Sequence, residues 1–134
     1  MDWKLEVVVI PVSDVDRAKH FYSEQVGFVV DTDVRMGESF RVVQLTPPGS
    51  ACSIAIGTGL AAMPPGAVKG MQLVVNDVEA ARAELVERGV EVSQVKHFDE
   101  GVPADGPGGD WNSFVFFSDP DGNGWAVQQV GARG

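Results

Sequence analysis

Hydrophobic and polar positions follow the same pattern twice along the chain. The first phrase, VSDVDRAKHFYSEQVG, spans Val12–Gly27, and the second, VNDVEAARAELVERG, spans Val75–Gly89. Each phrase follows an apolar run, begins with an Asp that can cap a helix, and ends at a glycine suited to a helix C-terminus. A repeat of this kind predicts two equivalent strand–helix–strand modules.

Apolar residues at helical spacing predict which side of each helix is buried. In the first helix, which begins after Ser13 or Asp14, these residues are Val15, Ala18, Phe21 and Tyr22. His20 falls nearly opposite and is expected to face solvent. In the second helix, predicted over Asp77–Arg88, the buried positions are Val78, Ala81 and Leu85.

Short runs rich in β-branched and aromatic residues predict strands around the two helices. In the first half these are Leu5–Val12, Phe28–Val34, Phe40–Thr46 and Ala51–Ile56. In the second half they are Val68–Val75, Val90–Lys96, Ser113–Phe117 and Gly124–Val130. Asp99–Asp110 is rich in glycine and proline and predicts a long loop, either a lid over a site or a mobile segment. The order βαβββ therefore occurs twice, which places the chain in the α+β class.

Length and composition predict one domain built from these two modules. The chain has 134 residues, 44% of them hydrophobic, which suits a single globular domain. We expect residues 1–57 to form module one, residues 58–67 a linker, and residues 68–134 module two.

The charge argues against several classes of partner, and the cysteine content indicates the compartment. The net charge is −9 and no cluster of Lys and Arg occurs, which argues against binding to nucleic acids or anionic membranes. The single cysteine, Cys52, excludes an internal disulfide and fits a reducing compartment. We find neither a signal peptide nor an apolar run long enough to span a membrane, so a cytoplasmic location is expected.

Three phrases together resemble the vicinal oxygen chelate superfamily: VSDVDRAKHFYSEQVGF, VNDVEAARAELVERGV and FFSDPDGNGWAVQQV. This superfamily groups glyoxalase I, extradiol dioxygenases, fosfomycin-resistance enzymes and bleomycin-type resistance proteins. Its members pair two βαβββ modules into a cup-shaped, curved mixed or antiparallel sheet with the helices outside. The resemblance implies this fold, a small-molecule ligand inside the cup, and a homodimer. Fold alone does not imply one activity.

The superfamily's enzymes hold a divalent metal with His, Gln or Glu, and the phrases locate the corresponding positions here. Seven residues before Asp14 lies Val7, and the same offset before Asp77 gives Gly70. The other two positions fall on Ala126 and near Ala55. None of these four side chains has a lone pair for a cation. We therefore expect no cofactor, although an atypical divalent metal site is not excluded.

Strand alternation predicts which residues line the cup. If Val7, Gly70 and Ala126 face inward, Gln72 and Gln128 do so too. The two carboxamides could orient a neutral or zwitterionic ligand, or they could pair with each other or with water.

Aromatic and polar residues extend this list of candidate ligand contacts. Trp111 adjoins the predicted lid, and Phe114 and Phe116 share one face of a strand, so their rings could stack on a planar ligand. Core packing is the alternative role for the phenylalanines. Arg41 could hold a carboxylate with two hydrogen bonds, or lie exposed on its strand, and Ser53 is a further polar candidate.

Two functions from different classes remain open. The first is a metal-free binding protein that sequesters a small, partly planar compound in a dimeric cup, as bleomycin-type resistance proteins do, and the net charge of −9 favours a neutral or cationic compound. The second is a glyoxalase-like lyase or isomerase, or a dioxygenase-like enzyme, acting on a small metabolite. His97 is the one plausible general base for such an enzyme, with no recognisable partner in the sequence.

Overall fold

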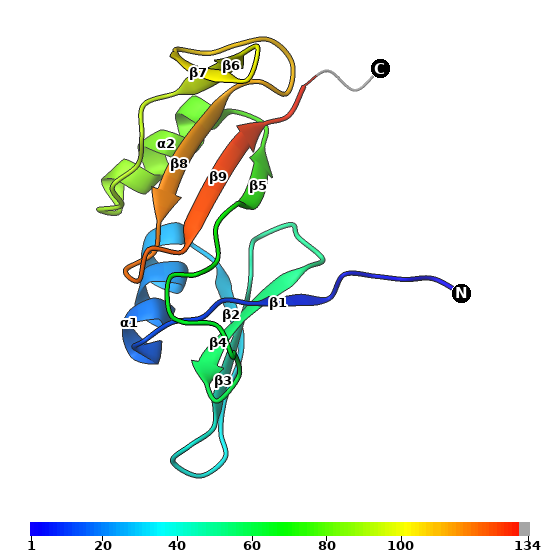
Figure 1. The fold of residues 1–134 in the computed structure, drawn as a ribbon, viewed down its shortest axis with the longest axis vertical. Helices are drawn as coiled ribbons and strands as arrows, with labels where there is room; N and C mark the ends of the chain where they lie inside the picture. Colours follow the sequence, from blue (N-terminus) through cyan, green and yellow to red (C-terminus); the bar gives the residue numbers. More distant parts are fainter. Residues whose placement is uncertain (132–134) are drawn as a thin grey trace. The chain divides into compact units, whose positions relative to one another are not determined.

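The computed structural model describes residues 1–131 and divides into two compact units (Figure 1). The first unit comprises Met1–Val68 together with the turn Asp119–Asn123, and the second comprises Lys69–Ser118 and the chain from Gly124 onward. The last three residues of predicted module two, 132–134, lie outside the described residues.

The first unit has the predicted order βαβββ. Its elements are β1 (Val7–Val9), α1 (Val15–His20), the π-helical turn η1 (Phe21–Val26), β2 (Val29–Arg35), β3 (Arg41–Thr46) and β4 (Ser53–Thr58). The strands form an open mixed sheet in the order β1-β4-β3-β2. β1 runs parallel to β4, and the other pairs are antiparallel.

The first helix begins and ends where its capping residues predict. The Asp14 carboxylate accepts a hydrogen bond from the backbone N–H of Arg17 at 3.0 Å. Gly27 adopts the left-handed conformation (φ 96°) after η1, as its position predicts. The predicted buried side is confirmed, because Ala18, Phe21 and Tyr22 are buried and Val15 is half-buried. His20 is exposed, as predicted.

The turn Asp119–Asn123 completes the core of the first unit, although it lies far along the chain. The Asn123 side chain is fully buried and donates from Nδ2 to the carbonyl of Pro11 at 2.8 Å and to Asp119 Oδ2 at 2.7 Å. The Tyr22 hydroxyl, also fully buried, donates to Asp119 Oδ2 at 2.8 Å. The DPDGN phrase therefore joins the first helix as well as connecting two strands.

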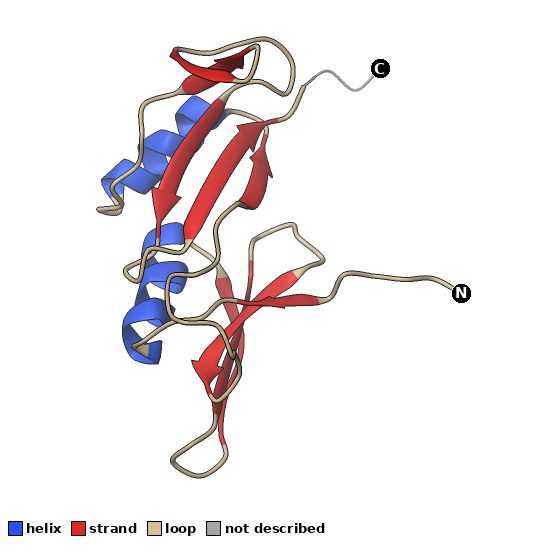
Figure 2. Ribbon diagram, viewed as in Figure 1, coloured by secondary structure: helices blue, strands red, loops and turns tan. Residues whose placement is uncertain are grey.

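The second unit forms an open mixed sheet of five strands with one helix. Its elements are β5 (Met71–Val75), α2 (Val78–Glu87), β6 (Lys96–Asp99), β7 (Val102–Asp105), β8 (Phe114–Ser118) and β9 (Gly124–Gln129). The strand order is β5-β9-β8-β6-β7, with β5 parallel to β9. Figure 2 shows α2 along one face of this sheet, where Val78 and Leu85 are buried. The α+β class is confirmed, and the strands form two open mixed sheets, each packed against its own helix.

Two predictions for the second unit were wrong. The segment Val90–Lys96 is not a strand: Val92 makes one isolated bridge with Phe117, and β6 begins only at Lys96. Only one backbone hydrogen bond joins Ser93 to Phe116, from the Ser93 N–H to the Phe116 carbonyl at 2.9 Å, and side chains bind the rest of Ser93: Arg82 Nε donates to its carbonyl at 2.8 Å, and its hydroxyl accepts from the N–H of Phe116 at 3.0 Å.

The predicted loop Asp99–Asp110 contains a strand, β7, which pairs antiparallel with β6. The chain reverses at Glu100 and Gly101, both with positive φ (50° and 82°). Two successive residues with positive φ form the tight turn that suits a hairpin. The second unit consequently has four strands after its helix, not three.

Of the helices in residues 1–131, none has the length and apolar character that a membrane crossing requires.

Candidate functional site

Each sheet has one face against its helix, the covered face, and an opposite face, the open face. In the first unit, strand pairing places Val7 beside Ser53, Val9 beside Ala55, and Gln44 beside Ala55. The first open face therefore carries Val7, Val9, Gln44, Thr46, Ser53 and Ala55. The Oγ1 of Thr46 and the Oγ of Ser53 lie 2.6 Å apart, which confirms that their side chains share this face.

Arg41 lies on the covered face of the first unit, so we do not retain it as a ligand contact. Its side chain is 7% exposed and donates from Nε and NH2 to the two oxygens of Asp33, at 3.0 and 2.8 Å. Its NH1 donates to Asp16 at 2.8 Å. Arg41 does bind a carboxylate with two hydrogen bonds, but that carboxylate belongs to the protein.

These ion pairs shift the protonation of the groups involved. Hydrogen bonds from Arg41 and Lys19 hold the pKa of Asp33 far below its usual value. The hydrogen bond from Arg41 likewise lowers the pKa of Asp16. The two carboxylates raise the pKa of Arg41. The cluster is therefore a fixed, charged element of the covered face at neutral pH.

The second open face carries the two predicted glutamines. Pairing places Gln72 beside Ala126, Val74 beside Gln128, and Phe116 beside Ala126. Since paired residues share a face, the second open face includes Gln72, Val74, Phe114, Phe116, Ala126 and Gln128. The prediction that Gln72 and Gln128 lie on the same face as Ala126 is confirmed.

The two carboxamides bind each other. Gln72 Nε2 donates to Gln128 Oε1 at 2.5 Å, and Gln128 Nε2 donates to the carbonyl of Trp111 at 2.7 Å. This is the mutual pairing that the sequence left open as an alternative to ligand binding. The pair still presents an amide group at an exposed position, because Gln72 is exposed.

Three aromatic rings form a cluster on the second open face. Phe114 and Phe116 are stacked at a centroid distance of 6.0 Å, and Phe98 meets them edge-on at 5.3 and 6.4 Å. All three are half-buried. Sequence reasoning missed Phe98 because β6 was not predicted at its position. A signal did exist, since Phe98 is an aromatic residue beside the Glu100-Gly101 turn.

Trp111 connects to the second open face through its backbone. Its φ is +60°, and its side chain is 39% exposed. The indole lies against Gly131, where an added Cβ would come within 2.5 Å of the ring. The predicted role of Trp111 as a ligand contact stays a prediction.

The residues at the four positions that correspond to metal ligands do not fit a divalent cation. Val7 and Ala55 lie on the first open face, Ala126 lies on the second, and Gly70 directly precedes β5. None offers an oxygen, nitrogen or sulfur from a side chain. Within residues 1–131, no three or more His, Cys, Asp or Glu side chains come together as a metal site would require.

His97 is held away from the aromatic cluster. Alternation along β6 places it on the opposite side from Phe98. Its Nδ1 lies 2.9 Å from the carbonyl oxygen of Gly106, which can only accept, so Nδ1 carries the proton and donates. His97 therefore adjoins the β6–β7 hairpin rather than the rings on which a planar ligand could stack.

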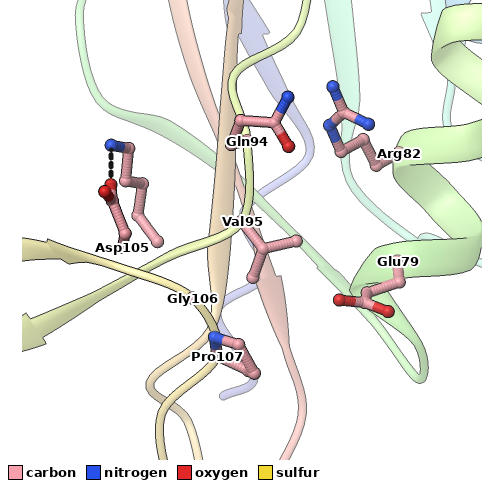
Figure 3. Close-up of a pocket in the computed structure, with 8 residues that line it drawn as sticks. Glu79, Arg82, Gln94, Val95, Asp105, Gly106 and Pro107 are labelled. Carbon is pink, nitrogen blue, oxygen red and sulfur yellow. Dashed lines mark hydrogen bonds and ion pairs between the residues drawn. The ribbon is translucent and has the colours of Figure 1, made fainter.

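A polar groove lies between α2 and the β6–β7 region (Figure 3). Its volume is about 760 Å³, and it is lined by Glu79, Arg82, Gln94, Val95, Lys96, Asp105, Gly106 and Pro107. Lys96 donates to Asp105 at 2.5 Å, which lowers the pKa of Asp105. The lining includes none of the ligand contacts that the sequence predicts.

Comparison with known protein families gives a match over most of the chain. Residues 4–127 match the Glyoxalase/Bleomycin resistance protein/Dioxygenase superfamily. The chain belongs to this superfamily. The resemblance to vicinal oxygen chelate proteins is thereby confirmed across most of the chain, while a comparison with curated protein sequences finds no match.

Solved structures similar to this chain include proteins from Streptomyces and from Sphaerobacter thermophilus. TnmS3, an antibiotic binding protein from Streptomyces sp. CB03234, is 36% identical with a TM-score of 0.76, over 96% of this chain and 97% of that one. A glyoxalase/bleomycin resistance protein from the same strain is 37% identical with a TM-score of 0.73, over 94% and 100% of the two chains. A superfamily member from Sphaerobacter thermophilus is 27% identical with a TM-score of 0.76, over 96% and 98%.

Proposed function

We propose that this protein binds a small, partly planar organic molecule of antibiotic type, and does so without a metal. The observation that carries the proposal is the set of residues at the four positions corresponding to metal ligands: Val7, Ala55, Gly70 and Ala126. Without donor atoms at these positions the protein has no bound metal to act as a Lewis acid or to activate water. Its open faces can still bind a small molecule. The similarity to TnmS3, an antibiotic binding protein, supports the same function.

The second open face supports a planar ligand in particular. Half-buried rings of Phe98, Phe114 and Phe116 give it an apolar surface to which a flat molecule can add further stacking. Gln72 and Gln128 add an amide pair that can exchange its internal hydrogen bond for one to the ligand. Apolar area with a few placed polar groups is the usual character of small-molecule sites.

Isothermal titration calorimetry against a panel of natural-product antibiotics tests this proposal. We expect at least one compound with a planar ring system to bind, and the variant Phe116→Leu to weaken that binding about three- to tenfold, the magnitude of one lost aromatic pair. Val86→Ala, an exposed position on α2, serves as the control and is expected to bind as the original protein does. Absence of binding to every compound in the panel would remove the proposal.

A lyase, isomerase or dioxygenase activity is the alternative, and one observation favours it. The Gly106 carbonyl fixes His97 with its proton on Nδ1, which leaves Nε2 with a lone pair that could accept a proton. The alternative predicts a new product when a bound compound is incubated with the protein and followed by mass spectrometry. His97→Asn must then abolish product formation while binding persists.

A homodimer and a cytoplasmic location stay predictions. The N-terminal segment before β1 carries Trp3 and Leu5, which are 88% and 72% exposed, so it has apolar surface to offer a second copy. Light scattering after size-exclusion chromatography measures the oligomeric state, and Trp3→Ser is expected to shift it toward the monomer. A monomeric original protein would contradict the expectation.

A further inference from the structure

A β-bulge in β2 places an additional polar side chain on the first open face. Val30 pairs with Leu45 of β3, and the next pair along the strands is Thr32 with Gln44. Asp31 is therefore an extra residue of β2 that has no paired residue in β3. Alternation puts Asp31 on the same side as Val29 and Thr46. With the bulge, the neighbouring residues Asp31 and Thr32 both lie on this face, and Asp31 adds a carboxylate to side chains that are otherwise apolar or neutral and polar.

Two hydroxyl groups support this carboxylate. Thr46 Oγ1 donates a hydrogen bond to Asp31 Oδ2, and Ser53 Oγ lies 2.6 Å from Thr46 Oγ1. An ionised carboxylate can only accept, so the Thr46 proton points to Asp31 and the Ser53 proton points to Thr46. The chain of donors thus ends on Asp31 and fixes the orientation of its carboxylate. Within residues 1–131, Asp31 Oδ1 has no hydrogen bond or ion pair, and the residue is exposed.

The charge of Asp31 has no counter-ion on its own face. The other residues that pairing places there are uncharged: Val7, Val9, Val29, Thr32, Val34, Val42, Gln44, Thr46, Ser53 and Ala55. Two cations of the first unit, Lys19 and Arg41, are bound to Asp33 on the covered face. Among the described residues of the first open face, Asp31 is therefore the one formal charge.

We propose that the first open face recognises a cationic nitrogen, the primary or secondary ammonium group of a small organic molecule, with Asp31 as its counter-ion. The inference rests on the proposed small-molecule binding and narrows the chemistry of the ligand. The free Oδ1 can accept a charge-assisted hydrogen bond from an ammonium N–H. Apolar side chains of the same face of β2, Val29 and Val34, suit the carbon skeleton of the molecule that carries the nitrogen. An anionic ligand is disfavoured by the unpaired carboxylate and by the net charge of −9.

Three simple probes separate charge from hydrogen bonding. Benzylamine, protonated at neutral pH, supplies both; benzyltrimethylammonium supplies charge alone; and benzyl alcohol supplies a donor alone. Benzoate is the anionic control. Each is titrated at low ionic strength into the ¹⁵N-labelled full chain, and amide shifts are followed by NMR. We expect benzylamine to shift the amides of Asp31, Thr46 and Ser53 most strongly, and benzoate to leave them unchanged.

Variants assign the effect to the carboxylate. Asp31→Asn keeps the acceptor for Thr46 but removes the charge, and is expected to weaken benzylamine binding about three- to fivefold, as for an exposed ion pair. Asp99→Asn changes the net charge equally at another exposed position and is expected to bind as the original protein does. Thr46→Val removes the supporting hydroxyl and is expected to give a smaller loss. Addition of 0.5 M NaCl must suppress binding by the original protein more than binding by Asp31→Asn.

The outcomes distinguish this inference from the proposed function. If benzylamine shifts no amide near Asp31, or if Asp31→Asn and Asp99→Asn behave alike, the cation site is overturned. If calorimetry nevertheless measures binding of an antibiotic, the proposed function stands without the cation site. If no antibiotic binds but benzylamine shifts depend on Asp31, the cation site is supported and the proposed function fails.

Discussion

Arg41 and Asp33 form an ion pair with two hydrogen bonds on the covered face of the first sheet, Nε to Oδ1 at 3.0 Å and NH2 to Oδ2 at 2.8 Å. This contact depends on the bulge at Asp31. Without the extra residue, Asp33 would fall on the open face, because a shift of one residue reverses the side of every side chain in a strand. Asp31 lies on the open face by alternation from Val29, and the bulge after it moves Asp33 to the covered face, beside Arg41.

Loss of the Asp33 carboxylate is expected to destabilise the protein. In Asp33→Asn the guanidinium of Arg41, 7% exposed, remains buried with only the exposed Asp16 as counter-ion. We expect the free energy of unfolding in urea to fall by about 1–2 kcal/mol, less than for a fully buried ion pair because the Asp33 side chain is partly exposed. The control Asp16→Asn removes a more exposed partner and is expected to reduce the free energy of unfolding less than Asp33→Asn does. Equal effects of the two substitutions would contradict this assignment.

The same carboxylate predicts a dependence of stability on pH. Hydrogen bonds from Arg41 and Lys19 depress the pKa of Asp33 in the folded state. The stability that ionised Asp33 contributes is therefore complete above the unfolded-state pKa of about 3.9. It is lost as the pH falls toward the lower pKa of the folded state. Urea unfolding between pH 7 and pH 2 measures this. The free energy of unfolding should decrease less steeply in Asp33→Asn than in the original protein once the pH falls below about 5. Parallel curves would show that other carboxylates dominate.

The hydroxyl of Tyr22 is expected to stabilise the turn Asp119–Asn123. It donates to the buried Asp119 carboxylate at 2.8 Å, so Tyr22→Phe removes a hydrogen bond to a charged acceptor while keeping the ring. We expect a loss of about 2 kcal/mol in the free energy of unfolding. Ser13→Ala removes a hydrogen bond to Asp121 at an exposed position and is expected to cost less. A loss in Tyr22→Phe no larger than in Ser13→Ala would argue against this role.

The four positions that correspond to metal ligands carry no donor atoms in their side chains, which predicts that the purified protein lacks a stoichiometric metal. Protein prepared without chelator or affinity tag is analysed for transition metals by mass spectrometry, and we expect far less than one equivalent per chain. Added Zn²⁺ or Ni²⁺ should leave the thermal midpoint unchanged, because a metal bound by the folded state would raise it. One equivalent that survives dialysis would require a metal site outside Val7, Ala55, Gly70 and Ala126.

Local patterns predicted the candidate site in part. Alternation placed Gln72 and Gln128 on the face of Ala126 correctly, because β5 and β9 are regular strands in which each residue reverses side. Alternation could not show that the two amides bind each other, since that depends on rotamers and on the position of Trp111. Phe98 was missed because its strand forms only where the chain reverses at Glu100 and Gly101.

The sequence by itself determined the two capped helices, the βαβββ order of the first unit and the absence of donor atoms at Val7 and Gly70. These features depend on residue type and short-range spacing, which can be read directly from the sequence. Only the tertiary structure decided the bulge at Asp31 and the partner of Arg41. Strand register is set by hydrogen bonds to a neighbouring strand, so one extra residue changes which face a side chain occupies without changing the local pattern of residue types.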